Sequence, residues 1–314
     1  MTSLFAKPVV VVSKCLGFAK CRYNEITIPD EFVEKLKDHV QFVTVCPELE
    51  IGLGVPRLPI RVVSIKKNIR LMQPATKNDL TDEIIQFIDS FVGRIKSVDG
   101  FILKSRSPSC GIKDVKIYAG LEKAAALGKG AGFLGRAVLN RFACLPVEDE
   151  NRLKNLRIRE HFLTKLFTLA CFRTTSKSLK GLVQFHTKNK FLLMAYSQKE
   201  LKILGQIIAN QEGQMIDDYE KHLFNAFMHI PRSTSNINIF MHAFGYFKKK
   251  LIPKEKNFFF EIVEKYSNGK ITLSAICLII KSWIIRFNED YLAKQTFFES
   301  YPAALTATSD SGKN

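Results

Sequence analysis

The chain contains 314 residues, of which 46% are hydrophobic, and its formal net charge is +17 at pH 7. This composition is typical of a folded globular protein and excludes a disordered or fibrous chain. The apolar stretch at residues 276–285 is interrupted by Lys281 and is too short to cross a bilayer, and the run at residues 9–12 is too short for a signal peptide. We therefore expect a cytoplasmic protein with no membrane partner. The seven cysteines, an odd number, argue against a disulfide framework.

Positive charge is concentrated in the second half of the chain. Residues 1–150 contain 22 Lys and Arg against 17 Asp and Glu, a net charge of +5, whereas residues 151–314 contain 25 against 13, a net charge of +12. Such a surplus attracts polyanions and favours nucleic acid or an anionic membrane as the partner. Solvated basic helix faces with no specific partner would give the same composition.

Three short apolar runs in the first half of the chain each precede a cysteine. The runs are residues 8–15 (PVVVVSKC), 40–46 (VQFVTVC) and 100–110 (GFILKSRSPSC). Short runs rich in β-branched residues and followed by turn-forming residues predict buried parallel strands. Cys15, Cys46 and Cys110 would then lie beyond the carboxyl ends of strands, at the rim where open α/β sheets bind ligands.

Further elements follow in the same half of the chain. Strands are predicted at residues 58–65 and 69–72, and a helix at residues 81–96 with Asp79 or Thr81 as its N-cap. The glycine-rich segment at residues 128–132 lacks the features of a dinucleotide-binding fingerprint, so it predicts a flexible turn near the rim.

After about residue 145 the pattern becomes helical, because apolar residues recur at i, i+3 and i+4. The expected helices cover residues 156–173, 184–211, 214–228, 235–251, 254–266 and 272–294. The predicted fold class is an α/β N-terminal domain with a mostly parallel sheet, followed by an all-α helical C-terminal domain. We place these domains at residues 1–145 and 146–305, with a disordered tail at residues 306–314.

The three cysteines have two interpretations from the residues alone. A cysteine near the end of a strand usually packs as a small core residue, and the compact zinc spacings are absent because the chain has no CxxC pair. However, Pro47 and Glu48 follow Cys46, and Cys110 lies in a Ser-Pro-Ser-Cys-Gly turn. Backbone N–H groups and hydroxyls in such turns offset the negative charge of an iron-sulfur cluster.

Several motifs, in order along the chain, resemble known families. Four motifs look like those of the TudS-type thiouracil desulfidases: residues 13–24 (SKCLGFAKCRYN), 46–57 (CPELEIGLGVPR), 78–81 (NDLT) and 103–111 (LKSRSPSCG). Four more resemble the YbgA-type helical domain: residues 145–153 (LPVEDENRL), 185–197 (FHTKNKFLLMAYS), 204–209 (LGQIIA) and 242–251 (HAFGYFKKKL). The combination is similar to the RudS family of tRNA thiouracil desulfidases.

The resemblance implies an iron-sulfur enzyme. In that family three cysteines hold a [4Fe-4S] cluster with one iron lacking a protein ligand, and the matching residues are Cys15, Cys46 and Cys110. The open iron binds the substrate sulfur as a Lewis acid, and water replaces that sulfur. Glu48 is then the candidate general base or acid. Its alternative roles are to cap a turn or to pair with Arg57.

Two serines beside Cys110 are further catalytic candidates. Ser107 is suited to position the water or to bind the pyrimidine, with a simple turn hydroxyl as the alternative, and Ser109 is a secondary candidate. Cys21 lies six residues after Cys15. The family pattern does not require this cysteine, so we expect a packed or spare thiol.

The helical half contains candidate nucleic-acid-binding residues, in which positive charge is mixed with aromatic rings as in RNA-binding surfaces. They are Lys188, Lys190, Tyr246, Lys248, Lys249 and Lys250. Lysines at a helix end also simply complement the helix dipole.

These observations lead us to expect a redox-neutral desulfidase that converts thiouracil bases to uracil in tRNA. One alternative is a desulfidase of free thiouracil, a small thiolated pyrimidine. A second alternative, from a different class, is a nucleic-acid-binding module in which the three cysteines and a histidine hold a structural zinc ion.

Overall fold

The computed structural model of the protein describes residues 5–121, 125–210 and 214–306. The chain forms two compact units that divide between Ala170 and Cys171, and it returns to the first unit at Pro302. The domain boundary that the sequence suggests at residue 145 stays a prediction. The predicted tail at residues 306–314 lies, apart from Thr306, outside the described residues.

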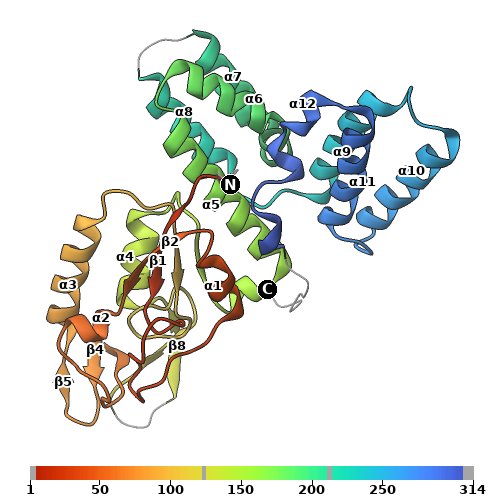
Figure 1. The fold of residues 1–314 in the computed structure, drawn as a ribbon. Coiled ribbons are helices and arrows are strands. Elements are labelled where there is room, and N and C mark those ends of the chain that lie inside the picture. Colours follow the sequence, from red (N-terminus) through yellow and green to blue (C-terminus); the bar gives the residue numbers. More distant parts are fainter. Residues whose placement is uncertain (1–4, 122–124, 211–213, 307–314) are drawn as a thin grey trace. The chain divides into compact units, whose positions relative to one another are not determined.

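A four-stranded parallel sheet forms the centre of the first unit (Figure 1). Its strands, in spatial order, are β2 (Gln41–Val45), β1 (Val9–Ser13), β6 (Gly100–Leu103) and β9 (Val147–Asp149). Val10, Val11 and Val12 of β1 are at most 1% exposed, because both faces of the sheet are covered. The predicted parallel strands are confirmed.

A second, mixed sheet, which the sequence analysis did not anticipate, lies in the same unit. Its strands, in spatial order, are β5 (Asn78–Asp79), β4 (Asn68–Gln73), β3 (Arg61–Ile65), β7 (Val115–Tyr118) and β8 (Ala126–Gly130). The strands predicted at residues 58–65 and 69–72 are β3 and β4, which pair in antiparallel fashion. Lys66 and Lys67 make the turn between them with φ values of 49° and 68°.

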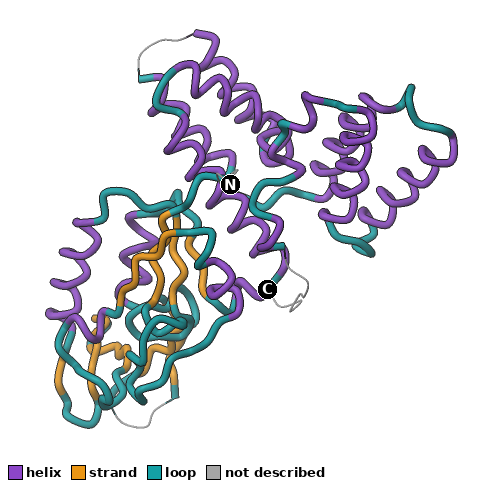
Figure 2. The backbone as a smooth tube through the Cα atoms, viewed as in Figure 1, coloured by secondary structure: helices purple, strands orange, loops and turns teal. Residues whose placement is uncertain are grey.

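Helices cover both faces of the parallel sheet (Figure 2). The helical elements of this unit are α1 (Glu31–Leu36), α2 (Pro47–Glu50), α3 (Thr81–Arg94), α4 (Phe133–Arg141), η1 (Arg152–Lys154), α5 (Leu156–Thr175), which runs on into the second unit, and η3 (Ala303–Leu305). Ile84 of α3 and Leu134 of α4 share one buried core with Phe101 of β6. On the opposite face, Leu166 of α5 packs against Gly100 so closely that a Cβ there would lie 2.9 Å from its Cδ1 atom.

The second unit is helical, as predicted. Its helices are α6 (Leu179–Tyr196), α7 (Gln198–Asn210), α8 (Met215–Ala226), α9 (Ser233–Phe247), α10 (Pro253–Ser267), α11 (Leu273–Phe287), α12 (Asp290–Ala293) and η2 (Thr296–Phe298). Two single helices expected from the sequence are each divided, at Ser197 and at Asn288, whose φ is +50°. Among the described residues, no helix combines the length and the hydropathy that crossing a membrane requires.

Candidate active site

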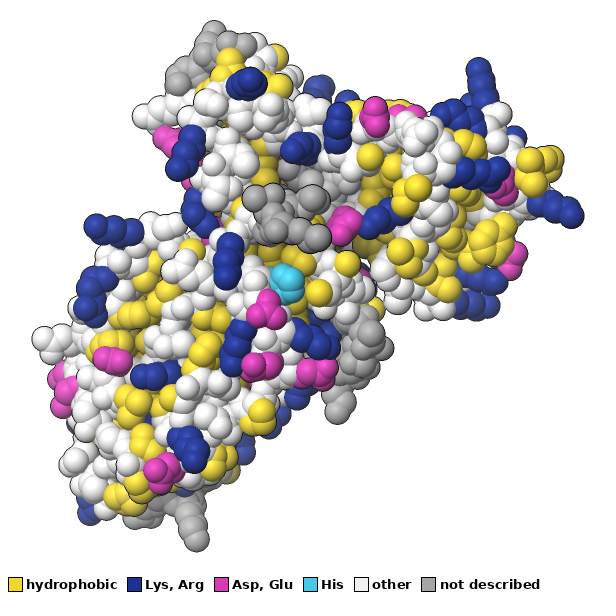
Figure 3. All heavy atoms as spheres, in the orientation of Figure 1, with side chains coloured by type: hydrophobic (Ala, Val, Ile, Leu, Met, Phe, Trp, Pro, Cys, Tyr) yellow, Lys and Arg dark blue, Asp and Glu magenta, His cyan; other side chains and the backbone are white. Residues whose placement is uncertain are grey.

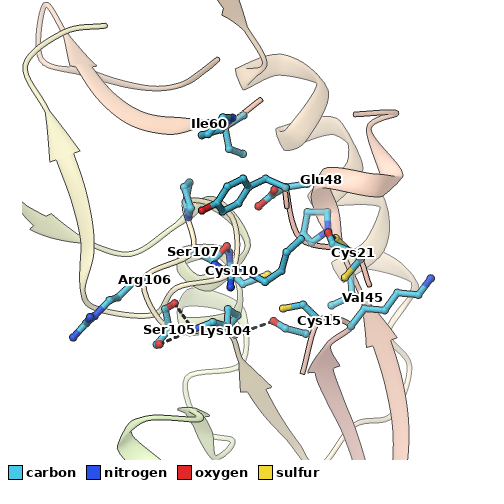
Figure 4. A pocket seen from close by; sticks show the side chains of 18 of the residues that line it. Cys15, Cys21, Val45, Glu48, Ile60, Lys104, Ser105, Arg106, Ser107 and Cys110 are labelled. Atoms are coloured by element: carbon cyan, nitrogen blue, oxygen red, sulfur yellow. Dashed lines mark hydrogen bonds between the residues drawn. The ribbon is translucent and has the colours of Figure 1, made fainter. Parts of the chain in front are cut away.

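A pocket of about 350 Å³ lies beyond the carboxyl ends of the parallel strands (Figure 4). Residues that follow the ends of β1, β2, β6 and β9 all contribute to its wall. This edge is the one at which open parallel sheets bind ligands. The lining residues are Ser13, Lys14, Cys15, Cys21, Arg22, Tyr23, Val45, Cys46, Pro47, Glu48, Arg57, Pro59, Ile60, Lys104, Ser105, Arg106, Ser107, Pro108, Cys110 and Asn151.

The structure brings Cys15, Cys46 and Cys110 to this one pocket. Cys15 follows β1, Cys46 follows β2 as the N-cap residue of α2, and Cys110 lies in the loop after β6. Cys46 is 9% exposed and Cys110 is 5% exposed, whereas Cys15 is partly exposed. The three thiols thus face one cavity from three strand ends, and their role as ligands stays a prediction.

Two glycines of the next helix hold the Cys110 loop in place. A Cβ at Gly132 would lie 2.8 Å from the carbonyl oxygen of Ser107, and one at Gly135 would overlap the backbone of Gly111. The N-terminus of α4 therefore packs directly against the loop, and Gly132 N–H donates a 2.7 Å hydrogen bond to Gly111 O. The flexible turn expected at residues 128–132 is wrong, because Ala126–Gly130 is strand β8 and Gly132 is the N-cap residue of α4.

A fourth cysteine, Cys21, also lines the pocket. It is 2% exposed and its thiol is hydrogen-bonded to the thiols of Cys15 and Cys46. The Cys46 Sγ atom also lies 3.9 Å from the carbonyl oxygen of Cys21. Sequence reasoning treated Cys21 as a packed or spare thiol, whereas the structure gives it a position on the cavity wall beside the other cysteines.

The thiols of the pocket have raised pKa values. The hydrogen bond to Cys15 raises the pKa of Cys21 to about 11, and burial raises the pKa of Cys110 to about 12. The pKa of Cys46 is also raised, first by its hydrogen bond to Cys21 and then by burial. Because metals bind thiolates, loading of this site would release protons from the cysteines.

Glu48 is held in the pocket by two partners. Its Oε2 atom accepts hydrogen bonds from Nε of Arg57, at 3.0 Å, and from Nη2 of the same guanidinium. Its Oε1 atom accepts a 2.8 Å hydrogen bond from the Ser109 hydroxyl. The Arg57 side chain is 4% exposed and that of Glu48 is 14% exposed, so the pair is shielded from bulk water. The pairing with Arg57 that the sequence left open is therefore present, and it leaves the carboxylate on the pocket wall.

The two candidate serines have different positions. Ser107 lines the pocket, and its Oγ atom accepts hydrogen bonds from the backbone N–H groups of Ser109 (3.3 Å) and Cys110 (3.1 Å). Its hydroxyl also faces the Cys110 sulfur, as does that of Ser13. Ser109 is fully buried behind Glu48. Ser109 is thus placed to orient Glu48, and Ser107 is placed to meet a ligand.

The segment after β9 completes the wall, which sequence reasoning missed. Glu150 is 5% exposed and accepts hydrogen bonds from Lys104 Nζ (2.5 Å), Ser105 N–H (2.8 Å) and Ser105 Oγ (2.7 Å). Asn151 lines the pocket and donates a 2.7 Å hydrogen bond to Ser105 Oγ. Both residues belong to the LPVEDENRL motif, which the sequence analysis attributed to the helical half.

Two arginines and an aromatic ring stand at the pocket. Tyr23 is 43% exposed, and the Arg22 guanidinium lies 5.5 Å from the centre of its ring. Arg106 is exposed and has a φ of 58°. This part of the wall therefore combines positive charge with an exposed ring, which suits phosphates and a stacked base.

The donor set fits an iron-sulfur cluster better than a single ion. Within the part of the chain that the structure describes, no three His, Cys, Asp or Glu side chains are arranged to hold one metal ion. In a cluster each thiolate binds a different iron, so cysteines spread around a cavity suit it. The zinc alternative needs a histidine, and none of the described residues that line the pocket is one.

The candidate nucleic-acid-binding residues lie on the surface of the helical unit. Lys188 and Lys190 of α6 are exposed, as are the three lysines that follow α9, Lys248, Lys249 and Lys250. The Tyr246 ring is 43% exposed and stacks on Tyr291 at 5.9 Å. On the face drawn in Figure 3, Lys and Arg side chains are spread over both units. The RNA-binding role of these residues stays a prediction.

The fold and the pocket define an α/β protein with a cysteine-rich site at the carboxyl edge of its sheet, joined to a helical unit. Residues 10–150 match the family described as 2-thiouracil desulfurase. Residues 190–302 match the family described as protein of unknown function (DUF1722).

Individual relatives match each part of the chain. YbbK of Bacillus subtilis (strain 168) is 30% identical over 139 residues, which cover 40% of this chain and 92% of YbbK. YbgA of Escherichia coli (strain K12) is 25% identical over 154 residues, which cover 48% of this chain and 83% of YbgA. A solved structure titled [4Fe-4S]-dependent thiouracil desulfidase TudS is 26% identical, with a TM-score of 0.38, and the match covers 47% of this chain and 93% of that one. The chain belongs to the 2-thiouracil desulfurase family and carries a DUF1722 domain, which confirms the resemblance in the motifs.

Proposed function

We propose that this protein is an iron-sulfur-dependent, redox-neutral desulfidase that converts thiouracil bases of tRNA to uracil. Its membership of the 2-thiouracil desulfurase family supports a thiolated pyrimidine as the substrate. The observation that carries the proposal is the meeting of Cys15, Cys46 and Cys110 with Glu48 in one pocket.

In this proposal Cys15, Cys46 and Cys110 hold a [4Fe-4S] cluster. When bound, the cluster supplies a thiophilic Lewis acid that polarises the C=S bond of the base. The hydroxyls of Ser13 and Ser107 face Cys110 and stabilise its thiolate, since each donates toward the sulfur.

Glu48 activates the water that replaces the sulfur. An ionised carboxylate has about four acceptor sites, and Arg57 and Ser109 occupy three of them with Nε, Nη2 and Oγ. The remaining site is on Oε1, where it can accept a hydrogen bond from the attacking water. Glu48 takes a proton from that water and returns it to the departing sulfur. The net reaction consumes water and releases hydrogen sulfide without electron transfer.

The size and charge of the pocket support a base presented by RNA. A volume of about 350 Å³ accommodates one pyrimidine rather than a stacked helix, so the base must be unstacked to enter. Arg22 and Arg106 can neutralise the flanking phosphates, and Tyr23 offers a ring to a neighbouring base.

Anaerobic reconstitution with iron and sulfide, followed by incubation with thiolated tRNA, tests the proposal. We expect nucleoside analysis to record loss of the thiolated base and a matching gain of uridine. Cys15→Ser, Cys46→Ser and Cys110→Ser should each lose the cluster and the activity. Cys277→Ala, in helix α11 of the helical unit, is the matched control and should retain both. A fully loaded protein that leaves every thiolated base intact would contradict the proposal.

The choice between tRNA and free thiouracil requires substitutions rather than truncation. Residues 171–301 are inserted in the first unit, and residues beyond 145 supply Glu150 and Asn151 to the pocket, so deleting the second half would damage the site. Replacing Lys188, Lys190, Lys248, Lys249 and Lys250 by Ala should weaken activity on tRNA and lower its salt dependence by about one log unit per lost phosphate contact. Activity on free thiouracil should not change. Equal activity of this variant and the wild type on tRNA would favour the free base as the substrate.

A further inference from the structure

We propose that Cys21 is a fourth protein ligand of the cluster, which occupies the remaining iron until the substrate sulfur displaces it. This inference rests on the proposed function, because it requires the cluster held by Cys15, Cys46 and Cys110. The open coordination position is then created when substrate enters and does not stand permanently open.

The position of Cys21 supports a ligand role. Its side chain is nearly inaccessible to solvent and lines the same cavity as the other three cysteines. Its thiol is in hydrogen-bonding contact with the thiols of both Cys15 and Cys46. Figure 4 shows Cys21 on the same side of the pocket as Cys15, with Cys110 facing them. A cysteine that served only as a small core residue would pack among apolar side chains instead.

The backbone around Cys21 is fixed by residues of the site. The carbonyl oxygen of Cys21 accepts a 3.0 Å hydrogen bond from Nη2 of Arg57, the same guanidinium that holds Glu48. Its N–H group donates a 2.9 Å hydrogen bond to Ala19 O. The loop between Cys15 and Cys21 turns at Gly17, whose φ is +82°. Cys21 is thus held at the pocket and is linked through Arg57 to the carboxylate.

The other donors of the pocket are less suited to the fourth iron. Arg57 and Ser109 hold Glu48, and Glu150 holds the ammonium of Lys104. Iron in a sulfur cluster prefers soft thiolates to hydroxyls and amides. Of the described residues that line the cavity, Cys21 is the one thiol left after the three predicted ligands are assigned.

The exchange of ligands is balanced without a redox partner. The Fe–S bond to Cys21 breaks, the Fe–S bond to the thiocarbonyl sulfur forms, and the released Cys21 thiolate takes a proton from solvent. No electron is transferred. A capped iron protects the cluster from oxygen between turnovers and favours ligands that bring their own sulfur.

Mössbauer and electron paramagnetic resonance spectra of the ⁵⁷Fe-loaded full-length protein test this inference without reference to activity. In the wild type without substrate, we expect four sulfur-ligated irons. Cys21→Ala and Cys21→Ser should each show one distinct iron with an oxygen or nitrogen ligand. If Cys21 occupies the iron in about nine of ten molecules, the probe thiol 2-mercaptoethanol should bind the variants about tenfold more tightly than the wild type. Cys277→Ala should match the wild type.

The outcomes separate this inference from the proposed function. A distinct iron without a fourth sulfur ligand in the loaded wild type overturns the role of Cys21 and leaves the proposed function standing. That measurement also decides the matter if the Cys21 variants fail to hold a cluster. A wild type that never acquires a cluster overturns the proposed function itself.

Discussion

The hydroxyl of Ser109 donates a 2.8 Å hydrogen bond to Oε1 of Glu48, although 61 positions separate the two residues in the chain. The bond joins the short helix after β2 to the Cys110 loop after β6. Two of the loops that bring cysteines to the pocket are therefore tied together through the candidate base. A small change at Ser109 is transmitted to Glu48 without touching the cavity.

Glu48→Gln should abolish most of the activity while the cluster remains. Glutamine keeps an oxygen acceptor for Arg57 but cannot take a proton from water, so kcat should fall about 10²–10⁴-fold. Turnover of thiolated substrate and the iron content of each protein are measured together. Glu50→Gln is the matched control, because Glu50 is an exposed residue of the same helix. Near-normal turnover of Glu48→Gln would remove Glu48 from the mechanism.

Ser109→Ala should lower kcat and leave KM unchanged. Ser109 is fully buried and does not line the pocket, so its loss affects the orientation of Glu48 rather than substrate binding. Loss of one hydrogen bond to a charged group costs about 1.5 kcal/mol, or roughly tenfold in rate. Ser107→Ala should instead raise KM, because Ser107 lines the cavity. Ser109→Thr keeps the hydroxyl and should restore part of the rate, which a purely structural role would not predict.

Gly135→Ala should destabilise the protein and its cluster site. The added methyl group would overlap the backbone of Gly111 and push the Cys110 loop away from α4, at a cost of about 1–3 kcal/mol. Urea unfolding and cluster retention in air both report this change. Gly93→Ala is the matched control, since its Cβ would meet no atom within 4 Å and helix propensity gains up to about 1 kcal/mol. Equal stability of the two variants would contradict the packing argument.

The parallel strands could be predicted because their sequence signal is local. Val10, Val11 and Val12 form a continuous apolar run that only a strand buried on both faces requires. The second sheet depends instead on pairing between distant segments, such as β3 with β7, which no local pattern records. The turn at residues 128–132 was mistaken for the same reason. Its glycines are required for contact with the loop at residues 107–111 and not for flexibility.

The missed helix breaks do have a sequence signal. Ser197 and Glu200 form the S-x-x-E pattern that begins a helix, and Ser197 Oγ accepts a 3.2 Å hydrogen bond from Glu200 N–H. Asn288 adopts the left-handed conformation typical of helix C-termini. The contribution of Asn151 to the pocket could not be read in this way, because it depends on β9 pairing with β6. Strand ends were therefore sufficient to gather the cysteines but not to complete the wall.

Lys165 provides a prediction about stability that is independent of the active site. It is 6% exposed in helix α5, and burial lowers the pKa of its ammonium to about 8 from an ordinary value of 10.5. Among the described residues, no carboxylate contributes to its pKa, so its charge is uncompensated at neutral pH. Lys165→Met should therefore increase the free energy of unfolding near pH 7 by about 1–3 kcal/mol.

The pH dependence of this gain has a definite sign. Between about pH 8 and 10.5 the unfolded state binds more protons at Lys165 than the folded state does, so wild-type stability rises with pH relative to Lys165→Met. The advantage of the variant should shrink through that window and be nearly absent above it. Urea unfolding of both proteins at several pH values measures the difference, and Lys154→Met, at an exposed lysine of η1, is the control that should show no such trend. A gain that stays constant from neutral to alkaline pH would assign the effect to packing rather than to a buried charge.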